Sequence, residues 1–339
     1  MPFKPILAPD NARVLTVLTI TLPFFALIAC GFLAARARWL HLSAIPGLNS
    51  FVLFFALPCM LFRFGASAPV GQLFAPPVAL TYLACALLTV GLCLALTRRG
   101  RLGWNDAAFG ALVAAFPNTG FMGVPLLVGL LGQAAATPVI VTLLVDMVVT
   151  SSLCIALSRL DDHGSEADGG ALQAAGKALR GVVANPLPWA ILAGAGVSWA
   201  QLALPVPLTK TVGLLADAAS PVALFTLGTV LARSVMQAAQ DRTYAVAWNT
   251  VVPVAMIKLL VHPLLVFGAG HAAMAAGWGL EPFALQVLVL LAALPSASNV
   301  VLLAERYGAD SGRIARIILS TTVAAYFTFS SAVYLLSVR

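Results

Sequence analysis

The sequence predicts an all-α integral membrane protein with ten transmembrane helices, arranged as two inverted five-helix repeats with broken crossover helices 4 and 9. Three observations carry this prediction. Hydrophobic residues make up 61% of the 339 positions, charged residues only 9%, and the mean hydropathy is +0.98. A soluble domain carries about 25% charged residues. The other two observations are the distribution of basic residues along the chain and a matched pair of prolines inside apolar segments.

Ten apolar segments are each long enough to cross the hydrocarbon core, which takes about 20 residues. They are expected at 14–35, 45–66, 75–97, 107–131, 136–158, 186–204, 210–232, 244–269, 282–305 and 314–337. The polar stretch 159–185 falls after the fifth segment. The chain is therefore expected to divide into a first five-helix repeat (14–158), a cytoplasmic linker (159–185) and a second five-helix repeat (186–337).

Basic residues predict the orientation. Thirteen of the 19 lysines and arginines lie in or beside the five alternate connections 36–44, 98–106, 159–185, 233–243 and 306–313. Cytoplasmic loops are enriched in Lys and Arg, so these connections are expected in the cytoplasm and both termini outside. The net charge of +7 then reflects basic loops near anionic lipid, and no nucleic-acid partner is expected.

An odd number of crossings in each half means that the second half is inserted upside down relative to the first. Inverted repeats of this kind are typical of secondary transporters. The sequence identity between the halves is small: Ala114, Ala115 and Pro117 align with Ala292, Ala293 and Pro295. The prediction therefore depends on topology more than on shared residues.

Two matched interruptions predict the binding site. The fourth segment contains Ala-Ala-Phe-Pro-Asn-Thr-Gly at 114–120, and the ninth contains Ala-Ala-Leu-Pro-Ser-Ala-Ser-Asn at 292–299. Proline removes a backbone donor and clashes with the preceding turn, so both helices are expected to break. Broken backbone at membrane depth is tolerated only where it packs in protein or lines a wet cavity. If the halves are antiparallel, the two breaks meet near the midplane.

The residues at these breaks are candidates for substrate binding. Asn118 and Thr119 are suited to cap the new half-helix and to bind a ligand, and the polar residues of the ninth segment can do the same. Helix N-termini with free N–H groups favour anions, so a carboxylate is the expected ligand. The candidates are Pro117, Asn118, Thr119, Pro295, Ser296, Ser298 and Asn299. A simple proline kink is the alternative for either helix taken alone.

Ionisable residues inside the predicted spans are candidates for charge or coupling roles, because each costs about 2.5–3.5 kcal/mol at a helix centre. They are Asp146 in the fifth span and Lys258 with His262 in the eighth, with Asp217 in the seventh expected to be structural. Lys258 could attract an anionic substrate or pair with Asp146, and Asp146 could bind a coupling H⁺ or Na⁺. A structural salt bridge is the alternative.

The sequence contains no HExxH, GxSxG or GxxxxGK[ST] pattern, so we expect neither an enzyme nor a nucleotide-driven pump. The five cysteines lie singly in apolar runs, and no metal site or cofactor is expected.

Several stretches are similar to the auxin efflux carrier family, which includes the plant PIN carriers and bacterial carriers of malonate and malate. The most specific is the run Pro-Asn-Thr-Gly-Phe-Met-Gly-Val-Pro at 117–125. Weaker matches are Leu48–Leu53 with Leu57-Pro58, Asn185-Pro186, Ser220-Pro221 with Leu224–Gly228, Lys258–Leu260 with Pro263, and Pro295–Asn299.

The resemblance implies a scaffold of helices 1, 2, 6 and 7, which also makes a homodimer contact, and a mobile transport domain of helices 3–5 and 8–10. It implies an elevator mechanism and places the carboxylate at the crossover prolines and asparagines, here Pro117, Asn118, Pro295 and Asn299. The linker of 159–185 is too short for the long loop of plant carriers. A bacterial organic-anion carrier in the inner membrane is therefore expected.

The expected function is secondary transport of a small mono- or dicarboxylate. The alternative is a membrane sensor that binds the anion on a carrier fold without moving it. Coupling to H⁺, to Na⁺ or to neither stays open at this stage.

Overall fold

The computed structural model describes residues 10–67, 75–99, 102–160, 186–240 and 248–337. In these ranges every regular element of secondary structure is a helix, and the only β-type pairing is one isolated bridge. Residues 161–185, which make up nearly all of the predicted linker, lie outside the described part of the chain.

The helices of the first half follow the predicted ranges to within a few residues. In chain order they are α1 (Asp10–Arg36), η1 (Leu42–Ala44), α2 (Ile45–Phe51), η2 (Val52–Ala56), α3 (Leu57–Ser67), α5 (Pro76–Arg99), α6 (Trp104–Ala115), η3 (Thr119–Gly123), α7 (Val124–Leu131), η4 (Gln133–Ala135), α8 (Ala136–Val145), η5 (Asp146–Thr150) and α9 (Ser151–Ser158). η1 and η4 are 3₁₀ turns, whereas η2, η3 and η5 are π-helical turns.

The second half contains α11 (Pro186–Trp199), α12 (Val206–Gln240), α13 (Trp248–Met256), the π-helical turn η6 (Ile257–Val261), α14 (His262–Ala275), α15 (Pro282–Ala292), α16 (Val300–Arg306) and α17 (Ser311–Ser337). The largest deviation is at α12, which continues to Gln240 rather than 232, whereas α11 ends early, at Trp199 rather than 204. Gln201 has a positive φ of 49°, and Pro205 follows, so the helix cannot continue.

Six helical stretches in the described ranges are long and apolar enough to cross a membrane. They are Leu42–Ser67, Pro76–Arg99, Gln133–Ser158, Val206–Arg233, Trp248–Ala275 and Ser311–Leu336. Shorter apolar helices lie at Leu22–Arg36, Thr119–Leu131, Trp189–Trp199 and Pro282–Ala292. Two of the shorter ones, Thr119–Leu131 and Pro282–Ala292, fall short because the fourth and ninth segments are interrupted. This helix content is that of a multi-pass membrane protein.

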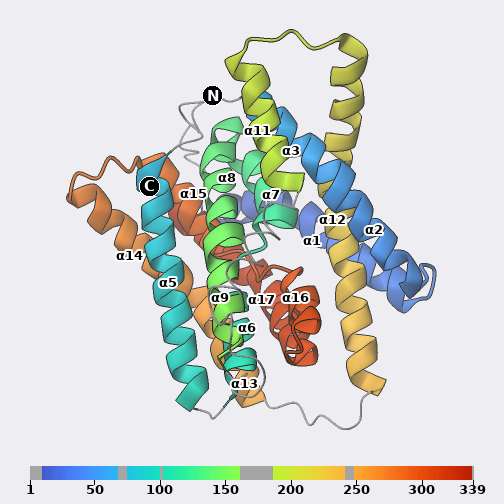
Figure 1. The fold of residues 1–339 in the computed structure, drawn as a ribbon, viewed down its shortest axis with the longest axis vertical. Coiled ribbons are helices and arrows are strands. Elements are labelled where there is room, and N and C mark those ends of the chain that lie inside the picture. The colour runs from blue at the N-terminus through green and yellow to red at the C-terminus, as the bar shows by residue number, and fades with distance from the viewer. Residues whose placement is uncertain (1–9, 68–74, 100–101, 161–185, 241–247, 338–339) are drawn as a thin grey trace, which may run out of the picture.

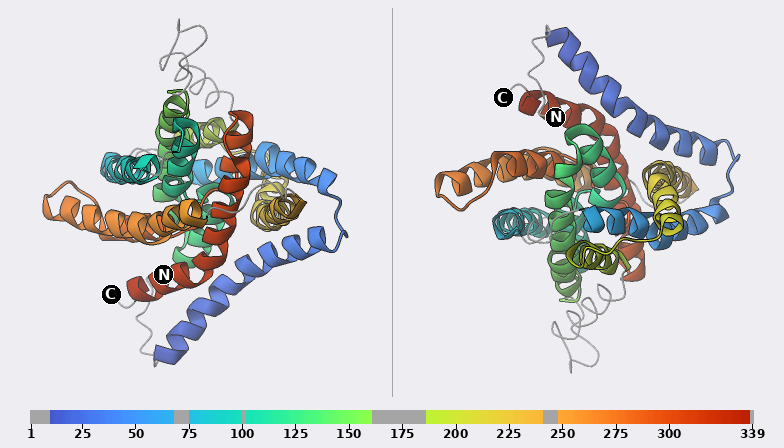
Figure 2. Two further views of the ribbon diagram at one scale, coloured as in Figure 1. Left: turned by 90° about the horizontal axis from the view of Figure 1, so that it is seen from below. Right: turned by 90° about the horizontal axis from the view of Figure 1, so that it is seen from above.

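One group of helices packs around α12. In the end-on views of Figure 2, α12 lies between α1 and α3, and α11 packs on α3. The backbones approach very closely at glycines. A side chain at Gly31 of α1 would overlap the carbonyl oxygen of Phe225 in α12, and one at Gly228 of α12 would overlap that of Ile28 in α1. Small residues at crossings of this kind let helices associate in lipid by backbone contact.

The contact between α3 and α11 repeats this arrangement. A side chain at Gly65 would overlap the carbonyl oxygen of Ile191, and one at Gly194 would overlap that of Phe62. Gly194 follows Gly31 by 163 residues, and Gly228 follows Gly65 by the same number. The α1–α12 and α3–α11 contacts thus use two pairs of glycines with the same spacing along the chain.

The remaining helices form a second group, in which α5 packs on α6, α8 and α14, α6 packs on α9, and α15 packs on α14 and α8. Helices α5 and α14 lie on the far side of the molecule from α1 (Figure 2). The two groups meet where α12 contacts η3 and α17, and where α1 contacts α17 and α7. The interrupted segment at η3 therefore lies at the boundary between the groups.

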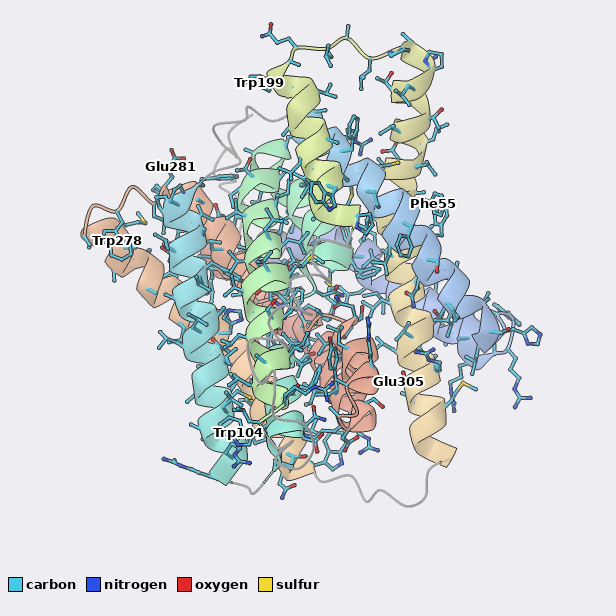
Figure 3. All side chains as sticks on the ribbon, in the orientation of Figure 1. Phe55, Trp104, Trp199, Trp278, Glu281 and Glu305 are labelled. Carbon is cyan, nitrogen blue, oxygen red and sulfur yellow. The ribbon has the colours of Figure 1, made fainter. Side chains whose placement is uncertain are left out.

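Aromatic and charged side chains mark the two ends of the molecule. Figure 3 shows Trp199 and Glu281 toward the upper end and Trp104 at the lower end. The Arg98 guanidinium lies 4.6 Å from the centre of the Trp104 ring, and Trp199 is largely exposed. Tryptophan is enriched at membrane–water interfaces. The apolar helices thus lie between two ends of the molecule that carry aromatic and charged side chains.

Candidate functional site

The fourth and ninth segments are each interrupted by a short non-helical stretch. α6 ends at Ala115 and the helix resumes at Thr119, whereas α15 ends at Ala292 and the helix resumes at Val300. Figure 1 shows α6 and α16 in the lower half of the molecule and α7 and α15 in the upper half. The two interrupted segments therefore run in opposite directions.

The two interruptions lie against each other and pair as a single antiparallel β-bridge between Pro117 and Ser296. The Asn118 N–H donates to the Pro295 carbonyl at 2.8 Å, and the Ala297 N–H donates to the Phe116 carbonyl at 3.0 Å. Backbone groups released from a helix in a membrane must find partners within the protein. Each interruption thus satisfies groups that the other has released.

Side chains satisfy further carbonyls at the ends of the two half-helices. The Ser296 hydroxyl donates to the carbonyl of Val113, near the end of α6, at 2.7 Å. The Lys258 ammonium donates to the carbonyl of Ala292, the last residue of α15, at 2.6 Å. The C-terminal end of a helix carries partial negative charge, so a cation there is stabilising. The ammonium therefore offsets negative charge that would otherwise face the crossing.

The side chain of Asn118 at the crossing has unused hydrogen-bonding capacity. Its side chain is 2% exposed, and its amide nitrogen has no hydrogen-bond partner. The expected side-chain cap is not formed at the start of η3; instead, the Asn118 carbonyl accepts the N–H groups of Met122 and Gly123. An unpartnered buried donor costs about 1–3 kcal/mol. This amide is therefore placed to donate to a ligand.

Unpaired backbone donors surround the crossing. The N–H groups of Gly120 and Phe121 in the first turn of η3 make no hydrogen bond within the described ranges, and neither do those of Ser298 and Asn299 before α16. Gly120 and Asn299 are partly accessible. Several backbone donors without a protein acceptor therefore lie within a few residues of the bridge between Pro117 and Ser296.

The other candidate residues have different roles. The Thr119 hydroxyl lies 3.4 Å from the Pro117 carbonyl, so it is used locally. Ser298 is buried, and Asn299 precedes α16 without making a side-chain cap. The structure thus brings the predicted residues of both segments together, although Ser296 and Thr119 already bond to backbone carbonyls.

A cluster of buried ionisable side chains lies next to the crossing. Asp146, Lys258 and His262 are all fully buried. The Lys258 ammonium lies 3.3 Å from Nδ1 of His262. An ammonium has no lone pair, so Nδ1 must accept and the imidazole proton belongs on Nε2. Lys258 thereby connects His262 with the end of α15.

Asp146 and Lys258 do not form the ion pair considered as an alternative from the sequence. The Asp146 carboxylate accepts from the Tyr82 hydroxyl at 2.7 Å and from the Thr150 hydroxyl at 3.1 Å. In the described chain, the one ion pair within 4.0 Å joins Arg63 of α3 to Asp217 of α12, at 2.7 Å. Asp217 therefore has a surface partner, whereas Asp146 has only neutral donors.

Tyr82 is a site residue that sequence reasoning missed. It lies in α5, is fully buried, and its ring centre is 6.0 Å from that of His262. The sequence did offer one indication of this role, because a tyrosine in the middle of an apolar span needs a hydrogen-bond partner for its hydroxyl. The partner, Asp146, is 64 residues away in the sequence and could not be identified from spacing.

The two charged residues lie in matching local structure. Asp146 begins the π-helical turn η5, and Lys258 lies within the π-helical turn η6. The Asp146 carbonyl accepts both the backbone N–H and the hydroxyl of Ser151, at 2.9 Å for the hydroxyl. π-helical turns within α-helices are found frequently at functional sites.

Comparison with known proteins agrees with this architecture. A profile of the family "Membrane transport protein" matches residues 16–334. The "Putative malonate transporter" of Rhizobium meliloti (strain 1021) is 31% identical over 324 residues, which cover 94% of this chain and 95% of the relative. The "Uncharacterized transporter YfdV" of Escherichia coli (strain K12) is 27% identical over 291 residues, covering 84% and 87%. "Auxin efflux carrier component 8" of Arabidopsis thaliana is 23% identical over 369 residues, covering 92% and 96%.

The family match covers both interrupted segments and the buried charge cluster, and three relatives spanning nearly the same length carry transport names. The chain therefore belongs to the membrane transport protein family that includes the auxin efflux carriers, and it is a multi-pass membrane transporter rather than an enzyme.

Proposed function

We propose that this protein is a secondary transporter of small organic anions, with mono- or dicarboxylates as its substrates and malonate as the first candidate. The name of the Rhizobium meliloti relative supports the choice of malonate. The observation that carries the proposal is the buried, unpartnered amide of Asn118 at the crossing of two interrupted helices.

The chemistry of the crossing favours an anion. A carboxylate accepts hydrogen bonds only, and here it would meet the Asn118 amide and the free N–H groups of Gly120 and Phe121. Hydrogen bonds to a charged group contribute about 1.5–3 kcal/mol each. The Lys258 ammonium, bonded to the end of α15, adds positive charge beside this place. Asn299, partly accessible, would contact the same ligand from the ninth segment.

The arrangement of helices supports an elevator mechanism. The proposal assigns ten transmembrane helices to two inverted repeats, with a scaffold made of the group around α12 and a transport domain made of the second group. The paired glycines at equal spacing in the two halves support the inverted repeats. Movement of the second group against α12 would carry the crossing from one side of the membrane to the other.

The proposed setting is the bacterial inner membrane, with both termini periplasmic and two copies joined through the scaffold. The thirteen basic residues in alternate connections support this orientation. Labelling of single cysteines introduced into the connections, from either side of a sealed membrane, tests it.

Uptake of radiolabelled malonate into proteoliposomes tests the function. We expect time-dependent accumulation that needs the protein and is inhibited by excess unlabelled malonate. Liposomes with equal amounts of Asn118→Ala or Asn299→Ala protein test the proposed binding site and should show much lower flux than wild type. Saturable binding with no flux would select the alternative, an anion sensor. The absence of both binding and flux for malonate and other small carboxylates would contradict the proposal.

A further inference from the structure

The cluster around Asp146 is not explained by anion binding alone, because a carboxylate disfavours an anion nearby. Asp146 and Lys258 are both fully buried, and their charges interact although they form no direct ion pair. With both groups charged, the cluster is close to neutral. Its net charge therefore depends on one proton.

The partners of Asp146 can accommodate both protonation states. The hydroxyls of Tyr82 and Thr150 donate to the carboxylate, at 2.7 and 3.1 Å. A hydroxyl can also accept, so either one can turn to receive the proton of a carboxylic acid. The change between the two states needs rotation of a hydroxyl and no movement of the backbone.

The same partners are poorly suited to a sodium ion. A hard cation takes several oxygen ligands through their lone pairs. Here the carboxylate of Asp146 has two hydroxyl partners, fewer oxygen ligands than a hard cation takes, and the Lys258 ammonium repels a second cation.

The cluster is connected to the crossing through one backbone segment. Lys258 donates to the Ala292 carbonyl, and three residues later the Pro295 carbonyl accepts the Asn118 N–H. When Asp146 is ionised, it offsets the charge of Lys258. When Asp146 is neutral, no carboxylate offsets the full charge of the ammonium beside the crossing, and an anion bound there supplies the missing negative charge. Charge that is buried in a membrane protein is costly until it is paired.

We propose that Asp146 binds the proton that is co-transported with the anion, so that protonation of Asp146 and anion binding at the crossing favour each other. This proposal rests on the proposed function and names its driving ion. The proton converts the Asp146 carboxylate to a carboxylic acid. Because such coupling is reciprocal, anion binding must take up a proton from solution.

Other titratable groups also face this cluster, and the experiment must distinguish them from Asp146. They are Tyr82 and Cys85 of α5, Cys154 of α9, Lys258 of η6 and His262 of α14. α15, which packs on α14, contributes none, since Pro282–Ala292 contains no titratable side chain.

The test is calorimetric titration of the purified protein with malonate across neutral and alkaline pH, where the carboxyl groups of malonate are ionised. Repeating it in buffers of different ionisation enthalpy gives the number of protons taken up per malonate bound. We expect uptake of up to one proton, with the dissociation constant rising by up to about tenfold per pH unit. Binding without proton uptake and with a flat pH profile would overturn the proposal.

Asp146→Asn mimics the neutral acid and should bind malonate with a pH-independent dissociation constant and no proton uptake. Asp217→Asn is the matched control, since Asp217 pairs with Arg63 at the surface, and it should behave as wild type. If Asp146→Asn protein takes up as many protons as wild type, another group titrates and the proposal is wrong.

Infrared spectroscopy separates this proposal from the proposed function. The carbonyl band of a protonated carboxyl group should disappear as the pH rises in wild type and be missing in Asp146→Asn protein. If this band titrates but malonate does not bind, the proton site is supported and malonate is rejected as substrate. If no such band titrates, Asp146 is not the proton site, whether or not malonate binds.

Discussion

Substitution of Asn118 by alanine should weaken anion binding without weakening the fold. The amide nitrogen of Asn118 is buried and has no partner in the protein, so its removal breaks no internal hydrogen bond. A hydrogen bond from this amide to a carboxylate is worth about 1.5–3 kcal/mol. The dissociation constant for malonate should therefore rise roughly 10- to 150-fold.

The stability of the ligand-free Asn118→Ala protein should stay within about 1 kcal/mol of wild type, because relief of an unpaired buried donor offsets the small cavity. Ser296→Ala is the matched control. Its hydroxyl donates to the Val113 carbonyl, so its loss leaves a buried acceptor unpaired and should cost about 1–3 kcal/mol of stability. Asn118→Ala should therefore lose affinity for malonate but keep its stability, whereas Ser296→Ala should lose stability but keep its affinity.

Thermal unfolding in detergent, with and without malonate, measures both quantities, since a ligand that binds only the folded state raises the apparent stability. Asn118→Ala protein should unfold at nearly the wild-type temperature but show little stabilisation by malonate. Unchanged stabilisation of this variant by malonate would refute the assignment of Asn118 to the binding site.

Three further predictions follow from local contacts. Gly228→Ala should destabilise the protein by about 1–3 kcal/mol, because its side chain would overlap backbone of α1. Gly213→Ala in the same helix meets open space and should be neutral or slightly stabilising, so equal thermal unfolding of the two variants would contradict the packing argument. Lys258→Met removes the donor at the end of α15 and the positive charge beside the crossing, so malonate binding measured by calorimetry should weaken at least tenfold. Arg63→Gln should change stability by less than about 1 kcal/mol in thermal unfolding, since the pair with Asp217 is substantially exposed, and a larger loss would show that the pair is shielded by lipid.

Much of the architecture was accessible from the sequence because membrane helices are determined by local properties. The length of each apolar run set the expected bounds of the helices, and the structure reproduces these ranges closely. Pro117 and Pro295 predicted two interruptions because proline acts on its own helix, whatever the surroundings. The structure breaks both helices at these residues. The number of crossings and the opposite insertion of the halves stay predictions.

The roles of individual polar side chains were harder to predict, because they depend on distant partners. Thr119 and Ser296 looked equivalent to Asn118 as ligand donors, yet their hydroxyls lie against the carbonyls of Pro117 and Val113. Lys258 could have faced Asp146, but its ammonium bonds to the Ala292 carbonyl. A side chain in a membrane takes whichever acceptor the neighbouring helix provides, and the sequence does not specify which helix that is.

The sequence by itself determined that this is an all-helical membrane protein with two interrupted helices, since hydropathy and proline act over short stretches of chain. Only the tertiary structure decided that the interruptions pair with each other through Asn118 and Pro295, that the Asn118 amide is left without a partner, and that Tyr82 bonds to Asp146. These contacts join residues 64 and 177 positions apart, and they form because buried polar groups must satisfy one another where water is absent.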